Sequence, residues 1–152
     1  MGRIVIVSGP PGAGKTTIAR RLSHHVPALR AMHMHTDDLY GYVRKGFIPP
    51  WQPEAMAQNI VLMEAIAASA TICARGGYDV FVDGIVGPWF FDPWLEAVQR
   101  HAIDLRYVVL LPSEDEAARR ISLRTRPGDM TDENVARQMW QDFQALPPPD
   151  GH

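Results

Sequence analysis

Residues 9–16 form a phosphate-binding pattern that limits the folds this chain can adopt. They read Gly-Pro-Pro-Gly-Ala-Gly-Lys-Thr and match G-x-x-x-x-G-K-[ST] at every fixed position. A short β-branched apolar run, residues 4–7, precedes the loop, and a helix-forming stretch, residues 18–22, follows it. A strand, a glycine-rich loop and a helix in this order place backbone N–H groups and a helix N-terminus around an anion. The sequence therefore predicts that the chain binds a nucleoside triphosphate.

The loop also predicts which residues hold the nucleotide. Lys15 would reach the β- and γ-phosphates, and the hydroxyl of Thr16 would coordinate Mg²⁺. A chance glycine-rich turn is the alternative, but the strand before the loop and the helix after it disfavour that interpretation. The residues that we expect to bind ATP are Gly9, Pro10, Pro11, Gly12, Ala13, Gly14, Lys15, Thr16 and Thr17.

The chain has 152 residues, which is enough for one domain with a sizeable core. No internal repeat or linker divides it, so we expect a single domain over residues 1–146. Residues 147–152 are a polar, proline-rich tail with no expected element of their own. The single cysteine, Cys73, excludes an internal disulfide and is compatible with a reducing compartment. Because no leader pattern precedes the first apolar run, we expect a cytoplasmic protein.

Charge and hydropathy limit the expected partners. The formal net charge of −2 gives no general attraction for nucleic acid, so a nucleic-acid partner is not favoured. The most apolar stretch, residues 60–74, contains Glu64 and several Ser and Thr residues and is too short to span a bilayer. We expect this stretch to be a helix packed on the core, and we expect no membrane partner.

Apolar runs and helical patterns alternate along the chain. Four runs indicate strands, at residues 3–8, 31–36, 78–83 and 105–111. Helical patterns with start and stop signals indicate helices at residues 14–25, 39–45, 54–75, 92–101, 113–124 and 131–146. Strands that alternate with helices predict a three-layer α/β domain of the P-loop type, with a parallel sheet in the order 2-3-1-4. The ligand of such a domain lies at the carboxyl ends of the strands.

Acidic residues follow two of the predicted strands at that edge. Asp83 ends the third strand, where it would hold Mg²⁺ directly or through water; a cap at a strand end is the alternative. Asp37 follows the second strand and would accept the proton of an attacking hydroxyl group. The neighbouring Asp38 fits the cap of the next helix better.

Arginines cluster after the fourth predicted strand. Arg120, Arg124 and Arg126 would act in catalysis by closing over the nucleotide and neutralising charge on the transferring phosphoryl group. Arg120 and Arg124 share a helix face, and a glycine-bearing loop, residues 126–130, follows them. A solvated surface face is the alternative, because most charge runs are of that kind.

Two further groups leave more than one interpretation open. His33 and His35 lie on the same face of the second strand, but no third ligand stands at a recognisable spacing, so a metal pair is disfavoured. Aromatic residues crowd the loops that flank the phosphate site, where they would either line a substrate pocket or add to the core. They are Trp51, Trp89, Phe90, Phe91 and Trp94.

Several of these segments together resemble the small P-loop kinases and phosphotransferases. That group includes chloramphenicol phosphotransferase, gluconate and shikimate kinases, and the kinase domain of polynucleotide kinase. The resemblance implies Mg²⁺-dependent transfer of the γ-phosphate of ATP to a hydroxyl group of a small molecule, and by position Asp37 matches the aspartate that serves as general base. The segments that carry the resemblance are Ser8 to Thr17, Thr36-Asp37-Asp38-Leu39, Val82-Asp83-Gly84 and residues 120–126.

Two departures from that family bear on the function. Polynucleotide kinase carries an arginine three residues after the aspartate, where this chain has Tyr40, so a nucleic-acid 5′-hydroxyl is disfavoured as acceptor. Nothing after Leu146 can form the fifth parallel strand that the family has beside the fourth. The fourth strand would then be an exposed apolar edge. We therefore expect either a longer native protein or a partner, such as a second copy in a homodimer, that covers this edge.

Other function classes remain as alternatives. A nucleotide-binding regulatory ATPase would hydrolyse ATP slowly and signal its state to a partner without a phosphoryl acceptor. A polynucleotide 5′-hydroxyl kinase is disfavoured by Tyr40 and by the acidic charge balance. An AAA+ motor is the least favoured class, because the chain lacks room for a helical lid domain. No pattern in the sequence identifies the acceptor.

Overall fold

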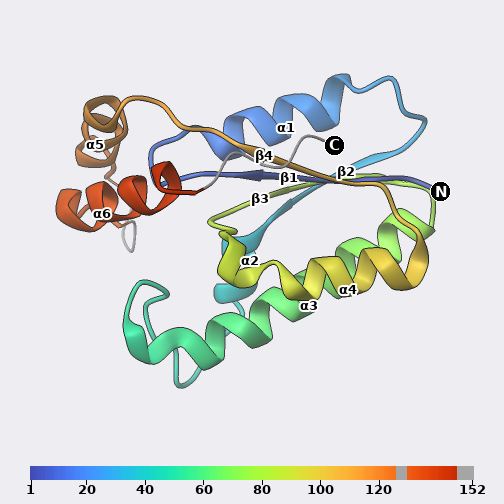
Figure 1. The fold of residues 1–152 in the computed structure, drawn as a ribbon, viewed down its shortest axis with the longest axis horizontal. Helices are drawn as coiled ribbons and strands as arrows, with labels where there is room; N and C mark the ends of the chain where they lie inside the picture. Colours follow the sequence, from blue (N-terminus) through green and yellow to red (C-terminus); the bar gives the residue numbers. More distant parts are fainter. Residues whose placement is uncertain (126–129, 147–152) are drawn as a thin grey trace.

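A parallel sheet forms the centre of the computed structural model, which describes residues 1–125 and 130–146 (Figure 1). Its strands are β1 (Ile4–Ser8), β2 (Ala31–His35), β3 (Asp79–Asp83) and β4 (Leu105–Val109). The α-helices are α1 (Lys15–His25), α2 (Thr36–Tyr40), α3 (Met56–Arg75), α4 (Asp92–His101), α5 (Glu114–Ser122) and α6 (Glu133–Gln144). Two short 3₁₀ turns, η1 (Pro53–Ala55) and η2 (Pro88–Phe90), precede α3 and α4.

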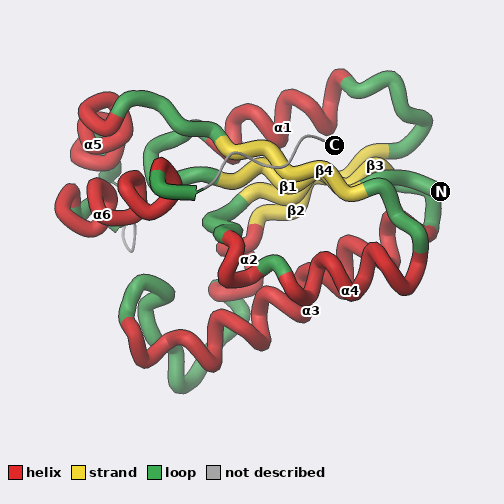
Figure 2. The backbone as a smooth tube through the Cα atoms, viewed as in Figure 1, coloured by secondary structure: helices red, strands yellow, loops and turns green. Residues whose placement is uncertain are grey.

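The strand order is β2-β3-β1-β4, and every neighbouring pair is parallel, as the sequence predicts. Helix α1 covers one face of the sheet and α3 and α4 cover the other, while α5 and α6 lie together beyond its carboxyl end (Figures 1 and 2). Parallel sheets covered on both faces bury whole strands. All five residues of β1 and of β3 are buried. The predicted α/β class with P-loop layering is therefore confirmed.

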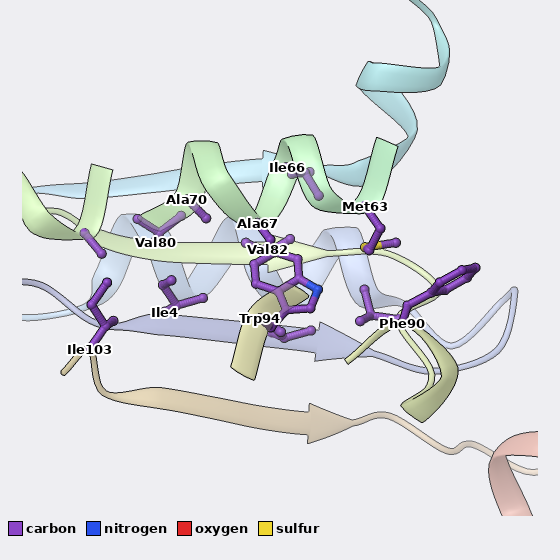
Figure 3. Packing of buried hydrophobic residues seen from close by; sticks show 13 residues of the cluster. Ile4, Met63, Ile66, Ala67, Ala70, Val80, Val82, Phe90, Trp94 and Ile103 are labelled. Carbon is purple, nitrogen blue, oxygen red and sulfur yellow. The ribbon is translucent and has the colours of Figure 1, made fainter. Parts of the chain in front are cut away.

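The main core lies between the sheet and the helices α3 and α4. Ile4 of β1 and Val82 of β3 belong to it, and Met63 and Ile66 of α3 meet them there (Figure 3). Trp94 of α4 lies among these residues and is fully buried. A smaller cluster under α1, on the other face, consists of Val5, Val7, Ala19 and Phe81. The sheet is thus fixed from both sides, which gives its carboxyl edge a rigid support.

One predicted helix is wrong. The sequence predicts a helix over residues 39–45, but α2 begins directly after β2 and ends at Tyr40. The amides of Tyr42 and Val43 donate to carbonyl groups three residues back, and Gly46 has a φ of 76°. Tight turns and a left-handed glycine do not continue an α-helix, so the chain becomes a loop after Gly41. Asp37 consequently lies in the first turn of α2, which fixes its backbone.

Helix α3 with the preceding turn, Pro53–Arg75, is long and apolar enough to cross a membrane by length and composition alone, because an 18-residue window within it has a mean hydropathy of 1.4. Its inner face nevertheless packs on the sheet as the sequence predicts. The buried residues of that face are Asn59, Met63, Ile66, Ala67, Ala70, Thr71 and Ala74. A helix packed in a protein core can have the same length and composition, so these two properties do not assign α3 to a membrane.

The edge of the sheet formed by β4 has no partner strand among the described residues. β4 pairs with β1 on its inner side, and Val108 is 43% exposed. The sequence predicts no fifth strand, and none occurs within residues 1–125 and 130–146. The predicted tail, residues 147–152, lies outside those ranges.

Candidate active site

The phosphate loop joins β1 to α1 at the carboxyl end of the sheet. Gly9 and Gly12 have φ angles of 141° and 79°, which side-chain-bearing residues rarely adopt. A Cβ on Gly12 would overlap the carbonyl oxygen of Ala117 in α5, and a Cβ on Gly9 would overlap that of Leu110. Both positions therefore require glycine, and the loop packs directly against the chain that follows β4.

Lys15 begins α1, and its ammonium group turns into the loop. Its Nζ donates a 2.8 Å hydrogen bond to the carbonyl oxygen of Pro10. Burial lowers the pKa of Lys15 to about 8, although the negative charges of Asp37 and Asp83 oppose that shift. The structure thus brings one cation and two carboxylates, all predicted from the sequence as site residues, to one place.

Asp83 is the point at which α1, β2 and β3 meet. Thr16 Oγ1 donates a 2.6 Å hydrogen bond to Asp83 Oδ2. His33 Nε2 lies 2.5 Å from Asp83 Oδ1, and His35 Nδ1 lies 3.0 Å from Oδ2. Burial of this carboxylate would raise the pKa of Asp83, but the hydrogen bonds from His35, Thr16 and His33 outweigh burial and hold that pKa below its ordinary value. Asp83 is therefore ionised and held from three sides.

His35 links Asp83 to Asp37. Its Nδ1 faces Asp83, and its Nε2 lies 3.4 Å from Asp37 Oδ2. The hydrogen bonds to Asp37 and Asp83 raise the pKa of His35 to about 10, so the ring is an imidazolium that donates to both carboxylates. The hydrogen bond from His35 in turn holds the pKa of Asp37 below its ordinary value. The Asp37 side chain is 72% exposed, so its carboxylate is ionised and accessible.

The chemistry of these groups fits Mg²⁺ better than a metal held by protein alone. His33 and His35 contact the Asp83 carboxylate, and the described residues contain no group of three or more His, Cys, Asp or Glu that could hold a metal ion. Mg²⁺ prefers oxygen ligands and usually takes one or two from the protein and the rest from substrate phosphates and water. Thr16 Oγ1 and Asp83 Oδ2, which lie 2.6 Å apart at the phosphate loop, are donors of this type.

The predicted arginines differ in their surroundings. Arg120 Nη1 donates a 3.1 Å hydrogen bond to the carbonyl oxygen of Gly12, and its Nε donates a 2.7 Å hydrogen bond to Glu116. Arg120 thus braces the phosphate loop from α5. Arg124 lines the cavity that contains the loop lysine. Arg126 lies outside the described residues.

A cavity of about 1230 Å³ opens at the carboxyl end of the sheet. Lys15 and Thr16 line it on the side of the phosphate loop, and Asp37 lines it at the start of α2. Its other walls come from the chain between α2 and the first turns of α3, from η2, and from residues 123–125 and α6. One continuous space therefore joins the predicted phosphate site to the predicted base.

The aromatic residues divide between the cavity and the core. Trp51 and Trp89 are 43% and 49% exposed and line the cavity, together with Phe90. Phe91 packs edge-on against Tyr107, with ring centroids 4.6 Å apart. Trp94 belongs to the core, as described above. Trp51 and Trp89 thus fit the substrate-pocket interpretation, whereas Phe90, which is 9% exposed, belongs to the core cluster as well.

A family model described as an AAA domain matches residues 5–141, a range that contains the phosphate loop and nearly the whole sheet. The chain belongs to this family. Several solved structures that share the fold are kinases, and together with the family model they confirm the predicted resemblance to P-loop kinases. No curated protein sequence matches the chain.

Solved kinase structures share the fold of this P-loop protein. A sugar kinase from Janibacter sp. is 18% identical with a TM-score of 0.68, over 98% of this chain and 82% of that one. The APS kinase CysC from Mycobacterium tuberculosis, in complex with AMPPNP and APS, is 19% identical with a TM-score of 0.62, over 94% and 96%. A shikimate kinase from Acinetobacter baumannii, in complex with shikimate, is 19% identical with a TM-score of 0.61, over 95% and 77%. These likenesses show the P-loop kinase fold.

One wall of the cavity is held by hydrogen bonds that the sequence of this P-loop kinase-type chain did not predict. Tyr40 Oη donates a 3.0 Å hydrogen bond to Asn59 Oδ1, and Asn59 Nδ2 donates a 2.8 Å hydrogen bond to the carbonyl oxygen of Pro50. Gln58 makes two hydrogen bonds to the backbone of Ile48, of 2.7 and 3.0 Å. Two adjacent amides at the start of an apolar helix were the available signal, because a buried amide needs partners.

Proposed function

We propose that the chain is an ATP-dependent kinase that transfers the γ-phosphate of ATP to a hydroxyl group of a small molecule, with Mg²⁺ as cofactor. The strongest support is that the Asp37 carboxylate opens into the same cavity as Lys15 and Thr16. A carboxylate that faces the terminal phosphate across an open space is the arrangement that phosphoryl transfer to a hydroxyl requires. Membership of a P-loop kinase family also supports the proposal.

In the proposed reaction, the acceptor oxygen forms a bond to the γ-phosphorus as the bond between that phosphorus and the ADP oxygen breaks. The hydroxyl proton passes to the Asp37 carboxylate, which His35 positions and keeps ionised. Lys15 and Arg124 would neutralise charge on the phosphate oxygens. Thr16 and Asp83 would hold Mg²⁺, which when bound supplies further neutralisation of the phosphate charge.

Two arginines have different parts in this proposal. Arg120 touches the backbone of Gly12, so it would act by holding the phosphate loop in shape rather than by contact with the transferring group. The role of Arg126 stays a prediction from the sequence. It stands two positions after Arg124 in the chain, which is compatible with a second charge that closes over the nucleotide.

The test replaces Asp37 and leaves the nucleotide site unchanged. Asp37→Asn keeps the size of the side chain and removes its charge. Asp38→Asn is the matched control, because Asp38 is not among the described residues that line the cavity. With labelled ATP and a panel of hydroxyl acceptors, Asp37→Asn should lower transfer by about 10²–10⁴-fold. Asp38→Asn should change transfer by no more than about twofold.

Binding of a non-hydrolysable ATP analogue, measured by calorimetry, should be the same in both variants. Transfer that survives Asp37→Asn at the wild-type rate would remove Asp37 as the base. ATP hydrolysis by the wild-type chain with no acceptor phosphorylated, combined with nucleotide-dependent binding of another protein, would favour the regulatory ATPase instead.

A further inference from the structure

The part of the cavity beyond Asp37 is lined by uncharged side chains. We call it the acceptor pocket and define it as the described lining residues from Tyr40, the last residue of α2, to η2. Its principal members are Tyr40, Phe47, Trp51, Asn59, Met63 and Trp89. Of the described residues between positions 40 and 90 that line the cavity, none is acidic or basic.

Positive charge in the cavity lies outside the acceptor pocket. Among the described lining residues, the cationic side chains are those of Lys15, Arg124 and His35, and His35 is paired with the carboxylates of Asp37 and Asp83. Arg44 and Lys45 stand in the loop after α2 but are not among the residues that line the cavity. An anionic group in the acceptor pocket would face aromatic side chains and the carboxylate of Asp37. A charge placed in such surroundings without a partner loses hydration that nothing replaces.

The polar groups of the acceptor pocket are neutral. Tyr40 donates its hydroxyl hydrogen to Asn59, so the phenol oxygen keeps the capacity to accept. The Asn59 amide keeps a second N–H after it donates to Pro50. Burial, and then the charge of Asp37, raises the pKa of Tyr40 to about 12, so the phenol does not ionise near neutral pH. Groups of this kind pair with the hydroxyl or amide functions of an uncharged ligand.

The apolar surfaces of the pocket are held in place before any ligand arrives. Gln58 and Asn59 fasten the loop at Ile48 and Pro50 to α3, and this loop carries Trp51. Trp89 packs against Phe143 of α6, with ring centroids 6.1 Å apart. The two indole rings are about half exposed and offer broad apolar faces. Such faces bind flat rings by stacking and by burial of apolar area.

We propose that the acceptor pocket takes a neutral alcohol with an aromatic or similarly flat apolar body, and that it discriminates against alcohols that carry a phosphate, sulfate or carboxylate group. The reactive hydroxyl lies at Asp37, the apolar body lies between Trp51 and Trp89, and remaining polar functions meet the Tyr40–Asn59 pair. Transfer to this alcohol rests on the proposed kinase function, whereas the charge preference of the pocket does not.

The experiment compares acceptors in matched pairs with the full chain, ATP and Mg²⁺. 3-Phenylpropane-1,2-diol is one member of a pair, and its analogue with a carboxylate on the ring is the other. Phosphorylated product is measured by mass spectrometry and ADP release by a coupled assay. We expect kcat/KM to be at least about tenfold higher for the neutral member. An equal or higher value for the carboxylate would overturn the inference.

A binding measurement tests the charge preference independently of the proposed kinase function. Quenching of tryptophan fluorescence is measured for both compounds in the presence of AMPPNP, with Trp51→Phe to assign the signal. If neither compound is phosphorylated, the proposed function loses support, yet tighter binding of the neutral compound still upholds the charge preference. Equal or tighter binding of the carboxylate, or no binding of either compound, contradicts the preference.

Gln52 offers a matched pair of charge variants. It is exposed at the rim of the pocket, and its backbone carbonyl rather than its side chain bonds to Ala55. Gln52→Lys should raise the ratio of kcat/KM for the carboxylate compound to kcat/KM for the neutral compound several-fold, and Gln52→Glu should lower that ratio. If both Gln52 variants leave the ratio of the two kcat/KM values unchanged, the preference is not set by charge in this pocket.

Discussion

Thr16 Oγ1 donates a 2.6 Å hydrogen bond to Asp83 Oδ2, although the two residues are 67 positions apart in the chain. The contact exists because β1 and β3 are parallel neighbours, with Val7 in register with Asp83. The loop after one strand and the end of the other therefore meet at the same edge of the sheet. A substitution at Asp83 consequently tests the proposed metal site and the stability of the fold together.

We predict that Asp83→Asn weakens Mg²⁺ binding at the proposed metal site and lowers the stability of the fold. The amide group turns a donor toward histidine and threonine side chains that now donate to the carboxylate, so unfolding free energy should fall by about 1–3 kcal/mol. The Mg²⁺ concentration for half-maximal ATP turnover should rise, and EDTA should stop turnover by the wild-type chain. Urea unfolding and ADP release across a Mg²⁺ titration measure the two effects.

The control for this prediction is Asp104→Asn, which breaks a surface pair with Arg106. Exposed ion pairs contribute about 0–1 kcal/mol, so stability and Mg²⁺ dependence should both stay near wild type. A wild-type Mg²⁺ requirement in Asp83→Asn would exclude Asp83 as a ligand.

Gly12 and Gly46 show two different physical reasons why a position requires glycine. Their φ angles are almost the same, 79° and 76°. A Cβ on Gly12 would overlap the Ala117 carbonyl oxygen, whereas nothing lies within 4 Å of a Cβ on Gly46. Gly46→Ala should therefore lower the unfolding free energy by about 1–2 kcal/mol, for the left-handed backbone alone. Gly12→Ala should lower it further and abolish nucleotide binding.

Urea unfolding and titration with a fluorescent ATP analogue measure this pair of variants. Equal losses of stability, with nucleotide binding retained by Gly12→Ala, would mean that α5 moves away from the phosphate loop without cost.

The fold was predictable where the signal is local. Ser113 is an example, because the helix predicted from residue 113 has it as N-cap, with its Oγ accepting a 3.3 Å hydrogen bond from the amide of Glu116. The helix predicted over residues 39–45 failed because the path of the chain there depends on Gly46 and on Gln58, which binds the backbone of Ile48 from α3. No local pattern records a contact made by a later helix.

Within the site, too, local signals were predictable and contacts between distant parts of the chain were not. Lys15, Asp37 and Asp83 each follow or end a strand, and a parallel sheet brings such residues together. The contact of His33 with Asp83 was not predictable, because it depends on the register of β2 against β3, which places His33 opposite Phe81 and which no local pattern sets. Trp89 lies in η2 and Trp94 lies in the first turn of α4, and the sequence did not distinguish the indole that lines the cavity from the indole that enters the core.

We predict that Gln58→Ala loosens the loop that carries Trp51. It removes both hydrogen bonds to the Ile48 backbone and leaves a part-buried amide and carbonyl without them. Amide hydrogen exchange over residues 47–53 should accelerate, and KM for the acceptor should rise while KM for ATP stays constant. Gln99→Ala, at an exposed position of α4, is the control and should change neither quantity. Unchanged exchange in Gln58→Ala would show that the loop is held by other contacts.

Arg119 and Arg124 are a matched pair at one end of α5. Arg119 makes two hydrogen bonds to Glu116, of 2.8 and 2.9 Å, on the exposed side of the helix, whereas Arg124 lines the cavity. Charge on the phosphoryl oxygens is neutralised most in the transition state, so Arg124→Ala should lower kcat by about 10²–10³-fold and change KM for ATP less. Arg119→Ala should leave kcat within about twofold, because exposed ion pairs are weak. Steady-state kinetics at saturating acceptor measure both variants, and Arg124→Lys should recover part of the rate if charge is the cause. Equal, small effects in both alanine variants would assign Arg124 to the solvated surface face that the sequence also allowed.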